Sequence, residues 1–100
     1  MEVKATRVSS IDDLKNPGDF LFTVDKQDRI CGMIEKCPCG CGLEGGISFV
    51  GPTYGQRGEG QRPLWDWNGD EDKPTLTPSI QRTAGCRWHG YLTDGVCRSC

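Results

Sequence analysis

Residues 37–42 read Cys-Pro-Cys-Gly-Cys-Gly, and residues 86–100 carry a second cysteine group, Cys86-x2-His89-x7-Cys97-x2-Cys100. Zinc prefers four tetrahedral sulfur and nitrogen ligands, and a short spacing lets two ligands on one turn reach the same ion. The glycines and Pro38 beside the thiols suit a tight turn whose backbone amides point at sulfur. The two groups therefore predict a Zn²⁺-binding protein, held by its metal rather than by a large apolar core.

The division of the ligands between these groups has two solutions. One is a self-contained C-terminal site made of Cys86, His89, Cys97 and Cys100. The other clamps the turn at residues 37–42 against Cys86 and a C-terminal thiol, closing a long loop. We favour the second solution because the first leaves three crowded thiols unexplained. The candidate ligands are Cys37, Cys39, Cys41, Cys86, Cys97 and Cys100, while Cys31 is expected to be a small core residue.

The seven cysteines also bear on compartment and redox state. In a secreted chain, a high cysteine content indicates disulfide bonds. In a cytosolic chain, it more often indicates metal binding or catalysis. The cysteine count is odd, and residues 1–16 contain no apolar segment of the kind that a secretory signal needs. We therefore expect a cytoplasmic protein whose cysteines bind metal.

The composition describes one small domain over residues 1–100. Hydrophobic residues make up 35% of the 100 residues, so the core should be thin, and 14 glycines and six prolines favour short strands and tight turns. A net charge of −2 gives no electrostatic footprint for nucleic acid or an anionic membrane. No apolar run approaches the roughly 20 residues of a membrane-spanning helix.

The order of elements predicts a mostly β fold of the small α+β type, with short antiparallel strands. We expect one short N-terminal helix at residues 9–16, capped by a serine and ended by Asn16-Pro17-Gly18. A long loop follows the third strand, and Trp65 and Trp67 beyond it should face the same side, most simply the core. The expected strands cover residues 19–24, 29–36 and 44–50, an extended stretch 75–80, and a C-terminal hairpin 89–100.

Four motifs together resemble a family of small phage and prophage zinc proteins: the cysteine turn at 37–42, residues 65–70, residues 74–80 and residues 86–92. The resemblance covers roughly residues 30–95. Members of this family also occur beside bacterial ubiquitin-like conjugation genes, where they look like peptidases that process or remove the ubiquitin-like protein. The resemblance thus implies a protein or peptide partner, with a ubiquitin-like protein as one candidate.

The same resemblance implies residue roles. Ser79 corresponds to a nucleophile, His89 to its general base, and the turn thiols with Cys86 to structural zinc ligands. A third group would orient the histidine ring, and the candidates are Asp66, Asp70, Asp72 and Asp94.

Other readings of these residues remain open. Ser79 is also compatible with a turn serine that bonds the backbone, and His89 with a fourth zinc ligand. A zinc-activated water with Glu44 as base is a further option. The chain is therefore a zinc-stabilised, peptidase-related hydrolase or a non-enzymatic phage-type zinc module that contacts a host or phage protein.

Overall fold

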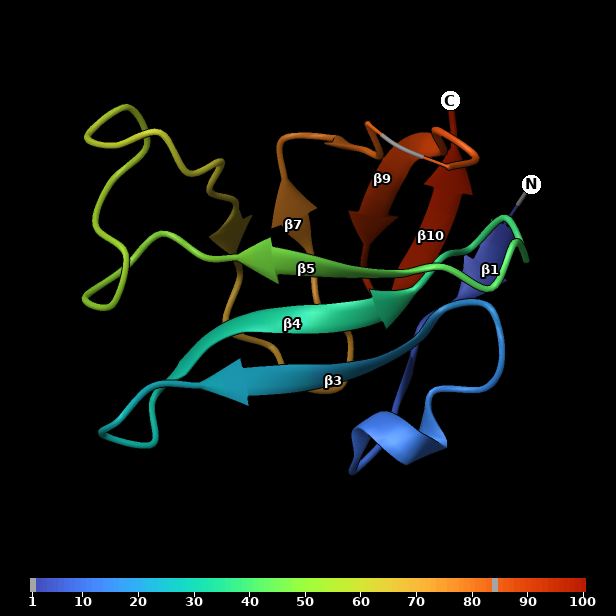
Figure 1. The fold of residues 1–100 in the computed structure, drawn as a ribbon, viewed down its shortest axis with the longest axis horizontal. Helices are drawn as coiled ribbons and strands as arrows, with labels where there is room; N and C mark the ends of the chain where they lie inside the picture. The colour runs from blue at the N-terminus through green and yellow to red at the C-terminus, as the bar shows by residue number, and fades with distance from the viewer. Residues whose placement is uncertain (1, 84) are drawn as a thin grey trace.

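Two four-stranded sheets pack against each other and enclose the core in the computed structural model, which describes residues 2–83 and 85–100 (Figure 1). The elements in chain order are β1 Glu2–Lys4, β2 Thr6–Arg7, the 3-10 helix η1 Ile11–Asp13, β3 Asp19–Val24, β4 Ile30–Lys36, β5 Glu44–Ser48, β6 Asp66–Trp67, β7 Leu76–Thr77, β8 Ile80–Gln81, β9 His89–Thr93 and β10 Val96–Ser99. This architecture confirms the mostly β fold class.

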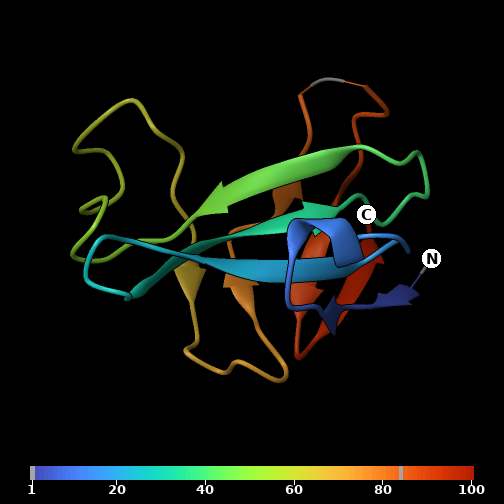
Figure 2. The ribbon, with the colours of Figure 1, turned by 60° about the horizontal axis from the view of Figure 1, so that its bottom comes forward.

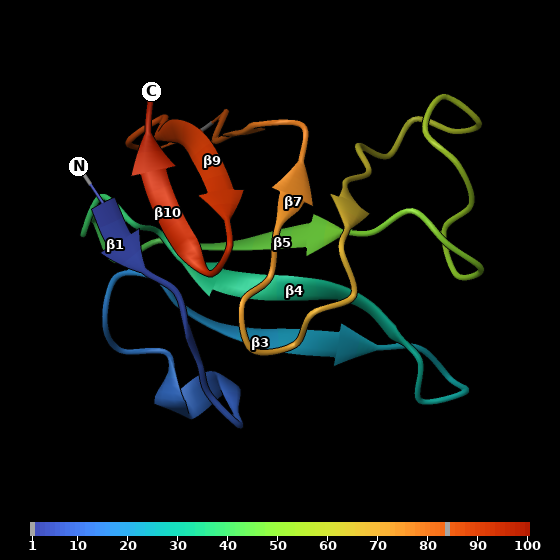
Figure 3. The same ribbon diagram turned by 180° about the vertical axis from the view of Figure 1, so that it is seen from behind.

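One sheet has the strand order β1-β10-β9-β8 and the other β2-β3-β4-β5, while β6 and β7 form a separate two-stranded ribbon. All pairs are antiparallel except β2 with β3. The chain passes from one four-stranded sheet to the other at Ala5, a buried residue whose N–H donates to the carbonyl of Gly95 (2.8 Å). Figure 3 shows β1, β10 and β9 in front of the second sheet.

The expected helix at residues 9–16 is wrong: a single 3-10 turn, Ile11–Asp13, stands in its place. Its N-cap, Ser10, makes no capping hydrogen bond to the backbone and instead bonds the carboxylate of Asp13. The turn buries none of its residues, so no apolar face stabilises a longer helix. Within residues 2–83 and 85–100 there is no helix with the length and apolar character needed to cross a membrane.

The strands predicted near residues 19–24, 29–36 and 44–50 are present as β3, β4 and β5, which pair in register as neighbours. The predicted C-terminal hairpin is present as β9 and β10. Its two-residue turn places Asp94 at φ 53° and Gly95 at φ 75°, the left-handed geometry of a type I′ turn. Asparagine, aspartate and glycine tolerate this geometry best, which is why the Asp-Gly pair sets the hairpin.

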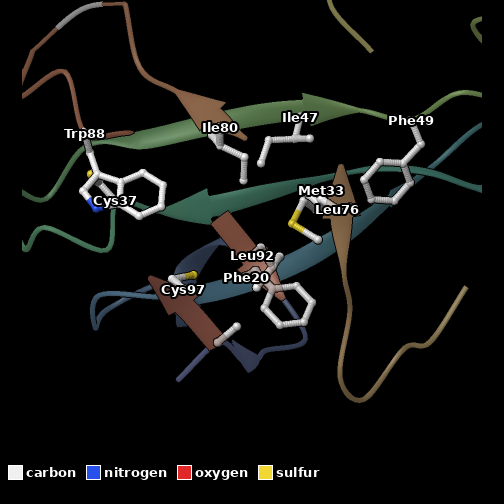
Figure 4. Close-up of a cluster of buried hydrophobic side chains, with 11 residues drawn as sticks. Phe20, Met33, Cys37, Ile47, Phe49, Leu76, Ile80, Trp88, Leu92 and Cys97 are labelled. Carbon is white, nitrogen blue, oxygen red and sulfur yellow. The ribbon is translucent and has the colours of Figure 1, made fainter. Parts of the chain in front are cut away.

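The core lies between the two sheets, where side chains from both meet (Figure 4). Phe20 of β3 and Met33 of β4 contribute from one sheet, and Leu92 of β9 from the other, each at most 1% exposed. Leu76 of β7 is equally buried. Burial of each such side chain stabilises the fold by about 1.5–3 kcal/mol.

Aromatic side chains extend this core toward the long loop at residues 51–63, which projects away from both termini (Figure 2). Trp67 stacks on Phe49 with ring centroids 5.3 Å apart and also contacts Phe22. Trp65 and Trp67 both pack against the core, as their alternation predicts.

A Leu92→Ala variant should lower the free energy of unfolding by about 2–5 kcal/mol, because it leaves a cavity where no solvent reaches. Leu43→Ala is the matched control, since that side chain is 48% exposed and should cost less than about 1 kcal/mol. Denaturant melts measure both variants. Equal losses would mean that the interface between the sheets is not the main core.

Candidate active site and metal centre

Four cysteines converge at one end of the molecule. The ligand atoms of Cys37, Cys39, Cys41 and Cys86 all lie within 4.8 Å of one another. Cys37 Sγ is 3.4 Å from Cys39 Sγ and 3.4 Å from Cys86 Sγ. Three of the thiols belong to one turn and the fourth comes from a position 49 residues away from Cys37, so the cluster joins the two halves of the chain.

The turn that carries three of these thiols is shaped by its glycines. Cys37 N–H donates to the carbonyl of Leu43 (2.8 Å), and Gly40 N–H donates back to Cys37 O (3.2 Å). Gly40 and Gly42 both have positive φ, at 89° and 86°, which side chains rarely adopt. The Cys41 N–H points at Cys39 Sγ (3.3 Å), as predicted for backbone amides in such a turn.

The donor set fits a tetrahedral thiophilic metal. A zinc ion with Zn–S bonds of about 2.3 Å holds its sulfurs about 3.8 Å apart, within the range of separations found here. Burial raises the pKa of the Cys37 thiol to about 12, whereas the thiol of Cys39 donates to Cys86 and lowers the pKa of Cys86. Complete deprotonation of four crowded thiols needs a cation among them. The four cysteines could therefore hold a metal ion.

The remaining predicted ligands lie elsewhere. Cys97 is buried in the core and its thiol donates to Glu35 Oε2 (3.5 Å). Cys100 is exposed just beyond β10, and its backbone N–H donates to His89 O (3.0 Å). The structure thus brings together the three turn thiols with Cys86, and it does not bring Cys97, Cys100 or the His89 ring to them.

Ser79 and His89 face each other at the β8 edge of the sheet with strand order β1-β10-β9-β8. The Nε2 atom of His89 lies 3.0 Å from Ser79 Oγ, a hydrogen-bond distance, and both residues are half-buried. The hydroxyl donates to Nε2 when the ring proton resides on Nδ1. The indole N–H of Trp65 donates to the carbonyl of Ser79 (3.2 Å) and so holds the backbone behind the hydroxyl.

Strand geometry explains this contact. Side chains alternate along a strand, so Ser79 and Gln81 share one face. Gln81 is the register partner of His89, and the hydrogen bond from Arg82 N–H to Trp88 O makes this pair a non-hydrogen-bonded one. Side chains in such pairs approach most closely, which brings the imidazole across to Ser79.

The packing of Trp88 and Gly90 keeps the His89 ring on the outer face of the sheet. Trp88 is buried in the core and donates through its indole N–H to Ser99 Oγ (2.9 Å). His89 follows directly and therefore points the other way. Gly90 lies so close to the Trp88 ring and to Arg98 O that a side chain there would collide with both.

None of the four proposed orienting aspartates contacts the His89 ring in the described residues. Asp66 pairs with Arg57, and the Asp70 carboxylate accepts the N–H groups of the Asp72–Lys73 stretch. Asp94 uses its backbone N–H to bond Thr75 Oγ1. The residues that the structure describes thus supply a serine–histidine pair without a carboxylate on the ring.

A buried polar network, which the sequence analysis missed, joins β4 to β10 and to the residue that follows β8. Glu35 of β4 is 0% exposed, and its carboxylate accepts a hydrogen bond from Arg82 Nη2 (2.8 Å) and from the Cys97 thiol (3.5 Å). Burial raises the pKa of the Glu35 carboxyl, while the Arg82 charge opposes that shift. The sequence held a signal, because Glu35 shares its strand face with the buried Met33 and Cys37.

Comparison with known protein families gives a match for this chain. The family model described as "Bacterial ubiquitination-like system serine protease (BubE)" matches residues 6–100. No curated protein and no solved structure matches the chain.

Cys86→Ser should remove a bound metal ion and lower the free energy of unfolding by on the order of 4 kcal/mol or more, because a lost ligand opens the clamp between distant segments. Cys100→Ser, outside the cluster, should retain both metal and stability. Elemental analysis of the purified variants and thermal melts measure these effects. A wild-type protein free of metal, or metal loss in the Cys100 variant, would contradict this assignment.

Proposed function

The chain belongs to the BubE family of bacterial ubiquitination-like system serine proteases, and we propose that it is a serine peptidase with Ser79 as nucleophile and His89 as general base. The observation that carries this proposal is the 3.0 Å contact between Ser79 Oγ and His89 Nε2. A hydroxyl is a weak nucleophile unless an adjacent base accepts its proton, and this contact supplies that base. Family membership supports the reaction class.

In the proposed reaction, Ser79 Oγ attacks the carbonyl carbon of the scissile bond while Nε2 of His89 takes the hydroxyl proton. The protonated ring then gives this proton to the leaving amine as the carbon–nitrogen bond breaks, leaving the acyl group on Ser79. Water hydrolyses the ester with His89 again acting as base. The carbonyl of Ser79, held by the Trp65 indole, fixes the backbone from which the nucleophile projects.

The metal is proposed to be zinc, held by Cys37, Cys39, Cys41 and Cys86. Four thiolates leave no open position for water, so zinc bound in this way supplies structure rather than Lewis acidity. This ligand set also leaves the His89 lone pair available to accept a proton. The further option of Glu44 as base for a zinc-bound water receives no support, because Glu44 pairs with Lys36 (3.6 Å).

A protein of a ubiquitination-like system is the proposed partner, with a ubiquitin-like protein as the substrate and the cytoplasm as the compartment. The family to which the chain belongs supports a protein partner. A phage-type zinc module without catalysis is the rival, and it requires no function for the contact between Ser79 and His89.

The Ser79→Ala variant should lose labelling by a fluorophosphonate, which reacts only with an activated serine, and should lower the rate of peptide-bond hydrolysis on the order of 10⁴-fold or more. Ser9→Ala is the serine control, because Ser9 is exposed and lies before η1, away from the reactive pair. Gel detection of the label and melting curves give the result. An unlabelled wild-type protein that is folded and metal-loaded would favour the non-enzymatic module.

The His89→Ala variant should keep its metal and melt within a few degrees of the wild type, because its ring is outside the thiol cluster and half-buried. Labelling of Ser79 should slow by about 10²–10⁴-fold, the usual contribution of a general base. Metal content, melting and labelling rate are measured on one preparation. Loss of metal in this variant would make His89 a ligand and leave Ser79 without its base.

A further inference from the structure

A groove of about 300 Å³ lies between strand β5 of one sheet and strand β8 of the other. We propose that this groove binds an extended, acidic segment of a substrate peptide through backbone pairing; this inference rests on the proposed function. Its volume is at the small end of ligand sites, which suits a short stretch of chain rather than a bulky cofactor. Its lining includes Gly46, Ser48, Arg62, Trp65, Gln81 and Arg82.

The groove adjoins the reactive pair. Trp65 lines it and donates its indole N–H to the carbonyl of Ser79. Gln81 also lines it and is the register partner of His89. A peptide that follows this groove is therefore led toward the Ser79 hydroxyl.

The β5 wall presents unused backbone groups. Phe49 N–H donates to Cys31 O at one end of the β4–β5 ladder, and Cys37 N–H donates to Leu43 O at the other. Because bonding alternates along an antiparallel ladder, Gly46 points its N–H and C=O away from β4. Ser48, of the same set, already accepts a hydrogen bond from Trp65 N–H (2.9 Å), so this edge does pair with an added chain segment.

On the β8 side of the groove, the backbone groups alternate in the same way. Arg82 N–H donates to Trp88 O (2.8 Å), so the neighbouring residue Gln81 directs its N–H and C=O away from β9. The carbonyl of Ser79 belongs to the same outward set, and it already accepts the Trp65 indole. Two sheet edges thus offer donors and acceptors to one groove, the arrangement by which proteins bind an extended peptide as an added strand.

The charge of the groove favours an acidic segment. Its lining contains two arginines and no carboxylate. Arg82 is paired with the buried Glu35, whereas Arg62 bonds the Ser48 hydroxyl (3.1 Å) and lies over the Tyr54 ring, with no carboxylate partner among the described residues. Arg62 is therefore the cation available to a peptide side chain. Gly46 leaves open space beside it, since a Cβ there would have no neighbour within 4 Å.

The test uses acetylated tetra-alanine amides with one glutamate placed at each position in turn, and a matching set with lysine. Two-dimensional NMR of the metal-loaded, full-length Ser79→Ala protein follows the amide signals of Gly46 and Gln81, at peptide concentrations up to about 10 mM. We expect these signals to move, with the best glutamate peptide binding about three- to fivefold more tightly than its lysine counterpart.

Two variants test the two parts of the proposal, which are the backbone pairing and the preference for an acidic segment. Gly46→Pro removes the outward N–H without touching the ladder to β4, a position where an edge strand tolerates proline, and should weaken binding about fivefold. Gly46→Ala is its control, because it retains the N–H. Arg62→Gln should abolish the preference for glutamate, while Arg98→Gln, which removes an arginine that pairs with Glu2 on another strand, should preserve it.

Three outcomes overturn the inference: signals that move elsewhere or not at all, a glutamate preference that survives Arg62→Gln, or the same shifts produced by sodium acetate alone. Fluorophosphonate labelling of the otherwise wild-type protein separates this inference from the proposed function, because that small probe needs Ser79 and His89 but not the groove. Labelling without peptide binding would refute the groove alone. Peptide binding without labelling would refute the serine chemistry and leave the groove standing.

Discussion

The convergence of Cys86 on the turn at residues 37–42 is the constraint on which the arrangement of the two sheets depends. The turn ends β4 and begins β5, whereas Cys86 lies between β8 and β9. Joining these segments closes a separation of 49 residues in a chain whose apolar fraction is only 35%. A small domain with a thin core gains most from such a closure, because a shared metal ion couples binding energy to folding.

A second connection between the two sheets is electrostatic. Glu35 of β4, Arg82 beyond β8 and Cys97 of β10 meet at a fully buried carboxylate. Such a group is costly to bury alone, so removal of its arginine would leave an uncompensated carboxylate and cost about 3–5 kcal/mol. The network therefore discriminates against any packing of the sheets that separates Arg82 from Glu35, and it holds the end of β8 against β4.

The sequence predicted these features unequally, for physical reasons. The strands at residues 19–24 and 29–36 followed from β-branched and aromatic runs, and the hairpin around Asp94-Gly95 from a turn that needs positive φ. The helix at residues 9–16 was predicted from capping residues alone, and it is absent because capping does not substitute for an apolar face. The meeting of the turn thiols with Cys86 was favoured from the sequence, and the structure brings these four together. The added ligands Cys97 and Cys100 lie elsewhere, because which C-terminal thiol reaches the turn depends on how the two sheets pack, and local spacing does not encode that.

In the candidate site, the short strand β8 and its flanking residues contribute to the core, to the reactive pair and to the groove, because side chains and backbone groups alternate in direction along a strand. Ile80 of β8 points into the core and anchors the strand there. Ser79 and Gln81, on either side of it, direct their side chains outward, where the cross-strand partner His89 meets the Ser79 hydroxyl. The same two residues turn their backbone groups sideways, toward β5 and the groove. Anchoring, proposed chemistry and proposed peptide recognition thus use the inner face, the outer face and the edge of one strand, and a shift of register by one residue would lose all three.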